Sequence, residues 1–125
     1  MTKKINLFKT GMFYNAYGDD AIVLFEVMGY KVSLKGISGF PEKSLPKVTN
    51  SLENYKIGFR IYNKDVIIEE YNGIDKMYKK IYKNGLKRLD MDRRLNTLYN
   101  KIDKMNEKQI KKIIENIEDK INEWF

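Results

Sequence analysis

Aromatic, amide and carboxylate side chains stand close together in residues 11–21. If this stretch forms a β-strand, alternation places two aromatic rings around an amide on one face, from Phe13, Asn15 and Tyr17. The chemistry of such a face is ring stacking together with uncharged hydrogen bonding. The Gly-Asp-Asp run at 18–20 then permits a sharp bend, and either aspartate can cap a helix that follows. The stretch therefore predicts a strand, a tight turn and a helix in quick succession.

A second candidate site is a run of basic residues in the second half of the chain, opposed within its span only by Asp90 and Asp92. Its members are Lys76, Lys79, Lys80, Lys83, Lys87, Arg88, Arg93 and Arg94. Helical spacing puts the five lysines on neighbouring turns, with Tyr78 and Tyr82 close by. A stripe of this kind can follow a phosphate backbone, and the release of counterions would make binding sensitive to salt. The alternative interpretation is an ordinary solvated helix face.

The composition restricts the chemistry further. The 125-residue chain has a formal net charge of +7, from 24 Lys and Arg against 17 Asp and Glu, which favours anionic partners such as nucleic acid or an acidic protein surface. It contains neither histidine nor cysteine, which excludes Ser–His and Cys–His nucleophiles, thiol chemistry and Cys-based zinc sites. The Gly-x-x-x-x-Gly-Lys-Ser/Thr phosphate loop is absent too. We expect a protein that is not an enzyme and that holds no cofactor.

Two acidic pairs, Asp19-Asp20 and Glu69-Glu70, are the nearest approach to a metal site in the sequence. Adjacent residues of a strand diverge and a third ligand is not evident, so helix capping and solvation explain these carboxylates better. Lys9 interrupts the N-terminus before an apolar segment forms, and no later window reaches the length of a membrane span. We therefore expect no metal site, no membrane partner and a cytoplasmic location.

Residues 11–15 read Gly-Met-Phe-Tyr-Asn, and an aromatic, a glycine and Asp-Asp-Ala follow at 17–21. This order resembles the N-terminal, mismatch-reading domain (domain I) of the MutS family, which carries Gly-Asp-Phe-Tyr-Glu, then an aromatic and an Asp-Asp-Ala or Asp-Ala step. A weaker likeness continues through Gly-Phe-Pro at 39–41 to about Tyr62, so the resemblance covers roughly the first half of the chain. It implies a mixed sheet surrounded by helices.

In that family the motif Phe stacks on a mispaired base and the motif Glu hydrogen-bonds to it. The resemblance therefore implies a stacking role for Phe13, with Tyr14 beside it. The glutamate position is Asn15 and the residue before the phenylalanine is Met12. A general nucleic-acid contact is thus a better expectation than mismatch reading, because an amide carries no charge. From spacing alone, the alternative is that Phe13 belongs to the core.

Periodicity predicts the elements that hold this strand in place. In chain order they are a buried helix over 21–28, a strand over 30–34, a loop over 36–41, a helix from Ser44 to about 54, a strand over 57–62 and a strand over 66–68. Gly29 suits the end of the first helix, and Pro46 is tolerated in the first turn of the second. This order argues for an α/β (α+β) fold with a small mixed β-sheet and flanking helices.

The pattern then becomes helical only. An apolar stripe over 74–82 predicts a helix that Asn-Gly at 84–85 ends, and a second stripe spans 95–105. Asn106 and Gln109 predict a capping pair at the start of the last helix. The two final helices cannot hide their apolar stripes alone, so we expect a C-terminal helical hairpin that also covers the sheet or a partner. The candidate domains are 1–72, the α/β module resembling MutS domain I, and 73–125, the C-terminal helical extension.

The leading hypothesis is a non-enzymatic nucleic-acid-binding accessory module related to the mismatch-recognition domain, with DNA, RNA or a hybrid as its partner. The resemblance also makes a reverse transcriptase a conceivable partner, because stand-alone proteins of this kind are associated with diversity-generating retroelements. Stacking and base-edge contacts would come from the motif, and electrostatic attraction from the basic run. The residues expected to bind are Phe13, Tyr14, Asn15, Lys76, Lys79, Lys80, Lys83, Lys87, Arg88, Arg93 and Arg94.

The alternative hypothesis is a protein-interaction adaptor that docks through its C-terminal helices and retains a vestigial nucleic-acid surface. An aromatic pair at a chain end is a good anchor when it is exposed. The competing interpretation is that the same residues pack on the sheet as core. The residues concerned are Ile113, Ile117, Ile121, Trp124 and Phe125.

Overall fold

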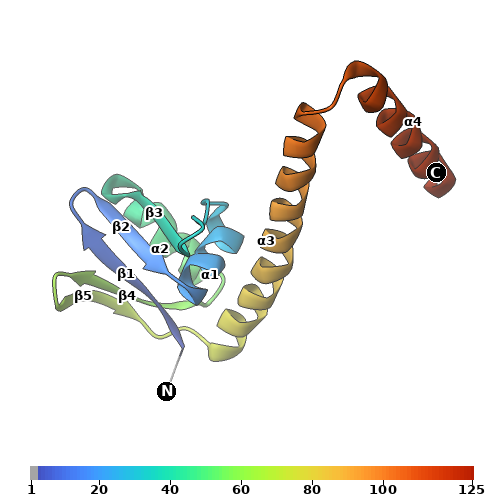
Figure 1. Cartoon of the computed structure of the whole chain (residues 1–125). Helices are drawn as coiled ribbons and strands as arrows, with labels where there is room; N and C mark the ends of the chain where they lie inside the picture. The colour runs from blue at the N-terminus through green and yellow to red at the C-terminus, as the bar shows by residue number, and fades with distance from the viewer. Residues whose placement is uncertain (1–2) are drawn as a thin grey trace. The chain divides into compact units, whose positions relative to one another are not determined.

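The computed structural model describes residues 3–125, and Figure 1 traces the chain through them. It divides into two compact units, the first ending at Leu89 and the second running from Asp90 to Phe125. The division lies beyond residue 72, where the sequence turns helical. The reason is that the first turns of the long helix α3 (Asp75–Asp103) contribute side chains to the core of the sheet unit.

The first unit is a five-stranded mixed sheet with helices packed on it, which confirms the expected α+β class. The strand order is β3-β2-β1-β4-β5; β1 runs parallel to β4, and the other neighbouring pairs are antiparallel. In chain order the elements are β1 (Lys4–Thr10), β2 (Phe13–Tyr17), α1 (Asp19–Met28), β3 (Ile37–Pro41), a 3₁₀ turn η1 (Glu42–Ser44), α2 (Leu45–Asn54), β4 (Gly58–Asn63), β5 (Val66–Tyr71), α3 and α4 (Glu107–Trp124).

Strand β1 lies at the centre of the sheet, and the sequence pattern did not single it out. Ile5 and Leu7 are fully buried and alternate with Asn6 and Phe8, which lie on the other face. Parallel pairing with β4 sets Asn6 against Arg60 in register. Flanking lysines hid this short apolar alternation, although the period of two was present in it.

The strand expected over 30–34 is wrong, and the strand β3 lies where a loop was expected. Tyr30 and Val32 pack against the core without forming a strand, whereas Ser38 and Phe40 point into the core from β3. Glycine and proline within 36–41 concealed the alternation. They are tolerated because β3 is an edge strand, paired with β2 only.

One face of the sheet is covered by α1 and α2, which Figure 1 shows on the same side of the strands. Their buried side chains meet those of the inner face of the sheet in a single core cluster. α1 follows Gly18, whose φ of 59° is the left-handed conformation that glycine adopts readily, and ends at Gly29 as expected. The helix has no side-chain cap among the described residues, so the expectation that an aspartate caps it is wrong.

At the other edge of the sheet, β4 and β5 form a hairpin across the expected turn at 63–65. β5 extends further than expected, to Tyr71. Its residues Val66, Ile67 and Ile68 are exposed, and two glutamates follow them.

Helix α3 continues through Asn84-Gly85, so the expected helix end is wrong. Gly85 is buried, and a Cβ built on it would lie 2.9 Å from the backbone oxygen of Ile22 in α1. The glycine therefore marks a close approach of two helix backbones rather than a C-terminus.

The second unit contains the rest of α3 and α4, joined by a turn at 104–106. The expected capping box is confirmed: the Gln109 N–H donates to Asn106 Oδ1 (2.9 Å), and the Asn106 N–H donates to Gln109 Oε1 (3.1 Å). No residue of α4, all of which the structure describes, is buried. Within the second unit, the apolar stripe of α4 is therefore not part of a core. Across residues 3–125, the structure has no helix with the length and apolar character that a membrane crossing needs.

Candidate functional site

The face of the sheet opposite α1 and α2 is called the open face here, and its chemistry comes from alternate residues of three strands. The aromatic, amide and guanidinium side chains that alternate with the core residues on β1, β2 and β4 are Asn6, Phe8, Phe13, Asn15, Tyr17, Arg60 and Tyr62. Register brings them into rows across the strands. Phe8 pairs with Asn15 on one side and Tyr62 on the other, and Asn6 pairs with Arg60.

Three aromatic rings of the open face form one cluster. The rings of Phe8 and Tyr62 stack with centroids 4.8 Å apart and planes inclined by 17°. Phe8 also contacts Tyr17 at 5.9 Å, in a tilted arrangement. Tyr17 is 45% exposed, so the cluster presents ring surface to a ligand. Rings held in this way by their neighbours offer stacking area with little conformational entropy to lose.

Phe13 lies on the same face at the start of β2, beside Thr10 and Pro41 in neighbouring strands. Its side chain is 51% exposed, and it forms part of the wall of a surface hollow of about 360 Å³ with Met12 and Lys43. Phe13 is therefore not a core residue. A flat ring projecting beside an open hollow is available for stacking.

Tyr14, which was expected to share the stacking role, is instead part of the core. It is only 5% exposed and stacks on Phe40 of β3 at 5.9 Å. The reason is the period of two in a strand, which turns residue 14 to the face opposite residue 13. The aromatic partner of Phe13 on the open face is Tyr17, since both occupy odd positions of β2.

Asn15 lies between the two exposed rings of β2 and is half-buried. It pairs with Gly39 in β3. A Cβ built on Gly39 would lie 2.3 Å from Asn15 Oδ1, so the amide rests over the glycine backbone. The glycine thus makes room for the one neutral hydrogen-bonding group between the two exposed rings.

The edge of the open face near β5 carries paired charges. Arg60 Nε donates to Glu70 Oε2 at 2.8 Å, and Lys4 Nζ lies 3.2 Å from Glu70 Oε1. The Arg60 hydrogen bond, followed by that of Lys4, lowers the pKa of Glu70. This carboxylate therefore holds Arg60 in place beside Asn6 rather than serving as a metal ligand.

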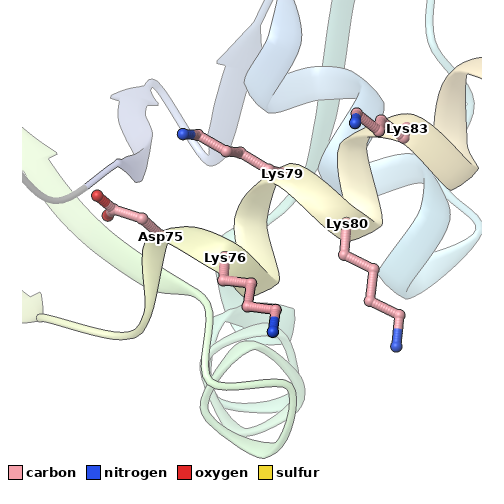
Figure 2. Close-up of a pocket in the computed structure, with 5 residues that line it drawn as sticks. All are labelled: Asp75, Lys76, Lys79, Lys80 and Lys83. Atoms are coloured by element: carbon pink, nitrogen blue, oxygen red, sulfur yellow. The ribbon is translucent and has the colours of Figure 1, made fainter.

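The lysine stripe, which is defined as Lys76, Lys79, Lys80, Lys83 and Lys87, lies on α3, and each member is exposed. A surface hollow of about 610 Å³ runs along the first turns of the helix, between Asp75 and Lys83. Figure 2 shows that Lys79 extends toward β1, whereas Lys76 and Lys80 point the other way. Lys79 is therefore turned toward β1, whereas Lys76 and Lys80 are turned away from it.

Lys79 connects the stripe with the open face. It lines a hollow of about 420 Å³ together with Asn6 and Arg60, which belong to that face. The lysine stripe thus meets the open face at this hollow, whereas Phe13 lines a separate hollow at the other end of β1. Its lining residues are Lys3, Lys4, Asn6, Asp20, Arg60, Asp75 and Lys79.

The arginines of the basic run serve differently from the lysines. Arg88 Nη1 lies 3.6 Å from Glu26 Oε1, and its guanidinium carbon lies 5.5 Å from the Phe25 ring centroid, so this side chain packs α3 on α1. Arg94 pairs with Asp90 one turn away at 3.7 Å. Arg93 and Arg94 both belong to the second unit. The basic run is therefore divided between the two units.

A buried hydrogen bond fixes the start of α3 relative to the sheet. The Tyr78 hydroxyl donates to Asp20 Oδ1 at 2.5 Å, and the Asn6 backbone N–H donates to Asp20 Oδ2 at 3.0 Å. Burial raises the pKa of Asp20, and the hydrogen bonds from the Asn6 N–H and the Tyr78 hydroxyl partly offset this rise. Burial and the hydrogen bond to Asp20 raise the pKa of Tyr78. Tyr78 is thus a structural residue rather than a ligand contact, and Lys79 beside it is held near β1.

Sequence reasoning missed Phe8, Tyr62 and Arg60 as members of the site. The signal for Tyr62 and Arg60 was the alternation over 57–62, which sets them on the strand face opposite Phe59 and Ile61. For Phe8 the signal was the alternation within β1, a strand that was not identified. Neither pattern could show that these strands are neighbours, because parallel pairing of β1 with β4 is a tertiary feature.

Comparison with known proteins adds no assignment. A scan against models of protein families finds no match to this chain, and a search of curated proteins finds none either.

Proposed function

We propose that this chain is a non-enzymatic nucleic-acid-binding module that stacks unpaired or mispaired bases on its open face. The observation that carries the proposal is the arrangement of Phe13 and the Phe8–Tyr17–Tyr62 cluster on one uncovered sheet surface. Every base has a flat aromatic face, so such a surface suits single-stranded or disrupted nucleic acid better than an intact duplex.

Charge supports the same proposal. Lys79 shares a hollow with Asn6 and Arg60, which lie two residues before Phe8 and Tyr62 on β1 and β4, so its ammonium group could meet a backbone phosphate of a strand stacked on these rings. The remaining lysines of the stripe add positive charge along α3, although Lys76 and Lys80 point away from β1. Phosphate contacts would position the strand, and Asn15 would reach a base edge between the stacked rings.

The resemblance to the MutS mismatch-reading domain supports the assignment of Phe13 as the stacking residue. A cytoplasmic setting and a polymerase of the reverse-transcriptase type as partner are parts of this proposal that rest on the resemblance alone. Asn15 in the glutamate position favours general binding of DNA, RNA or a hybrid over mismatch selection.

The test is a fluorescence-anisotropy titration with a labelled single strand, a matched duplex, a mismatched duplex and an RNA–DNA hybrid. Phe13→Ala is expected to weaken binding to the single strand by about 1–3 kcal/mol, or roughly 5- to 150-fold, because one stacked base is lost. Tyr17→Ala is expected to act in the same range. Tyr55→Ala is the matched control, since this exposed ring lies in the turn after α2, away from the open face.

A triple Lys79, Lys80 and Lys83→Ala variant tests the electrostatic part. It is expected to weaken binding to every sequence alike and to reduce the dependence of log K on log salt by up to about 0.7 for each lost phosphate contact on a single strand. A triple Lys101, Lys104 and Lys108→Ala variant removes the same charge from the second unit and serves as control. If Phe13→Ala and the first triple variant bind every probe as the parent does, the proposal is wrong.

A protein-interaction adaptor is the second candidate function, and the exposed apolar stripe of α4 favours it. Ile117, Ile121 and Trp124 are 50%, 44% and 73% exposed, and Phe125 follows at the chain end. An exposed aromatic anchor flanked by aliphatic side chains is typical of a docking helix. Binding of a partner that Trp124→Ala abolishes, with unchanged nucleic-acid binding, would support this function.

A further inference from the structure

The apolar stripe of α4 has the spacing of a coiled-coil seam. Its residues follow one another at intervals of four, three, four and three, which keeps them on one side of a supercoiled helix. All lie outside the core, and three of the five are at least 49% exposed. The seam consists of Ile110, Ile114, Ile117, Ile121 and Trp124.

The charges of α4 are distributed unequally along its length. Residues 107–114 carry three lysines, at 108, 111 and 112, against Glu107. Residues 115–124 carry four carboxylates, at 115, 118, 119 and 123, against Lys120. Two copies of this helix therefore attract one another when they run antiparallel, and they repel when they run parallel.

The seam fixes the register of an antiparallel pair. Alternate seam layers would set Ile114 against Ile117 of the second copy, and Ile110 against Ile121 of the second copy. In that register Lys111 and Glu118, which flank the seam on the same side, come to lie opposite one another across the pair, twice by symmetry. The apolar spacing and the charges thus select the same arrangement.

The other occupant to consider is the second half of α3, which carries a seam of equal spacing. Its residues are Met91, Leu95, Leu98, Ile102 and Met105. Folding α4 back on this seam would set Asp92 beside Glu118, and Arg94 beside Lys120, so both flanking pairs would be of like charge. Leu95 and Leu98 are themselves 51% and 55% exposed. Charge therefore favours the second copy over this intrachain partner.

We propose that the chain forms a homodimer by antiparallel pairing of α4 with α4 of a second copy, flanked by Lys111–Glu118 ion pairs. The surface is independent of the open face, so the dimer forms without nucleic acid. This inference goes beyond the proposed nucleic-acid binding, and neither depends on the other.

Sedimentation equilibrium of the full chain, without nucleic acid and over the micromolar range, tests the proposal. The expected mass at high loading is twice 14.9 kDa. Ile117→Asp is expected to weaken association at least tenfold, since it places a charge in the central layer. Leu34→Asp is the matched control, because Leu34 is an exposed leucine in a loop of the first unit. A parent chain that stays monomeric throughout would overturn the proposal, as would dissociation by Leu98→Asp equal to that by Ile117→Asp.

A charge exchange tests the register. Lys111→Glu and Glu118→Lys are each expected to weaken self-association, because each variant sets like charges across the pair. An equimolar mixture of the two is expected to associate more tightly than either alone, since both ion pairs are restored between unlike chains. Circular dichroism of each variant before mixing is the control for folding. Because the mixture contains the same two chains, a folding defect in either of them cannot produce the tighter association of the mixture. A mixture that associates no better than its components would overturn the antiparallel register.

Discussion

The two halves of α3 are the same helix with the same amphipathic pattern, yet they have opposite environments. In the first half, Tyr78, Ile81 and Leu89 are buried against the sheet unit. In the second half, Leu95, Leu98 and their neighbours are exposed. The difference shows that periodicity predicts a helix and its apolar side. Which element of the fold, if any, packs on that side depends on tertiary structure.

What distinguishes the first half is the close approach of α1. Gly85 lets the two helix backbones meet, and Tyr78 reaches Asp20 at the start of α1. The second half has neither feature. Stability and association should therefore respond to substitutions on opposite sides of the unit boundary.

The largest effect is expected from truncation in the first half. Ile81→Ala should lower the free energy of unfolding by about 2–5 kcal/mol, because it removes buried methyl groups and leaves a cavity. Leu98→Ala, the matched change in the second half, should alter it by less than about 0.5 kcal/mol. Urea denaturation at low protein concentration measures both. Equal losses would mean that the two halves are covered alike.

A smaller effect is expected at the helix contact. Gly85→Ala should destabilise the fold by about 1–3 kcal/mol, since its Cβ would meet the Ile22 carbonyl and must push α3 away from α1. The control is Asn84→Ala, an exposed position one residue earlier, which should be neutral or stabilising because alanine favours helix. A stabilising Gly85→Ala would refute close backbone approach as the reason for the glycine.

Tyr78→Phe is expected to cost about 1–3 kcal/mol at neutral pH, because a buried carboxylate loses a donor. Burial raises the pKa of Asp20 in the folded chain, so stability from this group is present below its ordinary pKa and is lost as pH rises through the raised value. Removing the hydroxyl raises that pKa further. The deficit of the variant should therefore grow from acid to neutral pH, which denaturation across a pH series would measure. A loss of unfolding free energy that does not change with pH would mean that the Tyr78 hydroxyl does not stabilise the fold through ionised Asp20.

The smallest effect on folding is expected from removing α4. A chain ending at Met105 should unfold within about 0.5 kcal/mol of the parent at low concentration, since no residue of α4 is buried. The same chain should lose self-association. A large loss of stability would show that α4 belongs to the core of the sheet unit.

Much of the sheet unit could be predicted from its sequence, because α1, α2, β2 and the β4–β5 hairpin have clear periodicity and turn residues. Alternation within β2 also predicted that Phe13, Asn15 and Tyr17 share a face, but it left open whether this face is the outer one. β3 could not be predicted, since its glycine and proline are features of an edge strand that only strand order reveals. Tyr14 was predicted at the site, whereas Tyr17 lies there. The prediction took Tyr14 because it is adjacent to Phe13, although adjacent residues of a strand point to opposite faces.

The composition of the site was harder to predict than its individual parts. Phe8 and Tyr62 lie far apart in the sequence and meet only because β1 and β4 are parallel neighbours. Likewise, nothing local distinguishes Lys79, which borders the open face, from Lys80 one residue later. Sequence spacing predicts which residues share a helix face, but not which of them reach a neighbouring strand.

The outer edge of β5 bears on how this protein behaves in solution. Val66, Ile67 and Ile68 lie exposed at the end of the sheet, where unsatisfied backbone groups can template an additional strand. Glu69 sets a negative charge beside this apolar edge, which opposes the approach of a second copy, whereas Glu70 is paired with Arg60 and Lys4. Loss of the Glu69 charge by substitution would therefore favour strand-to-strand association at this edge.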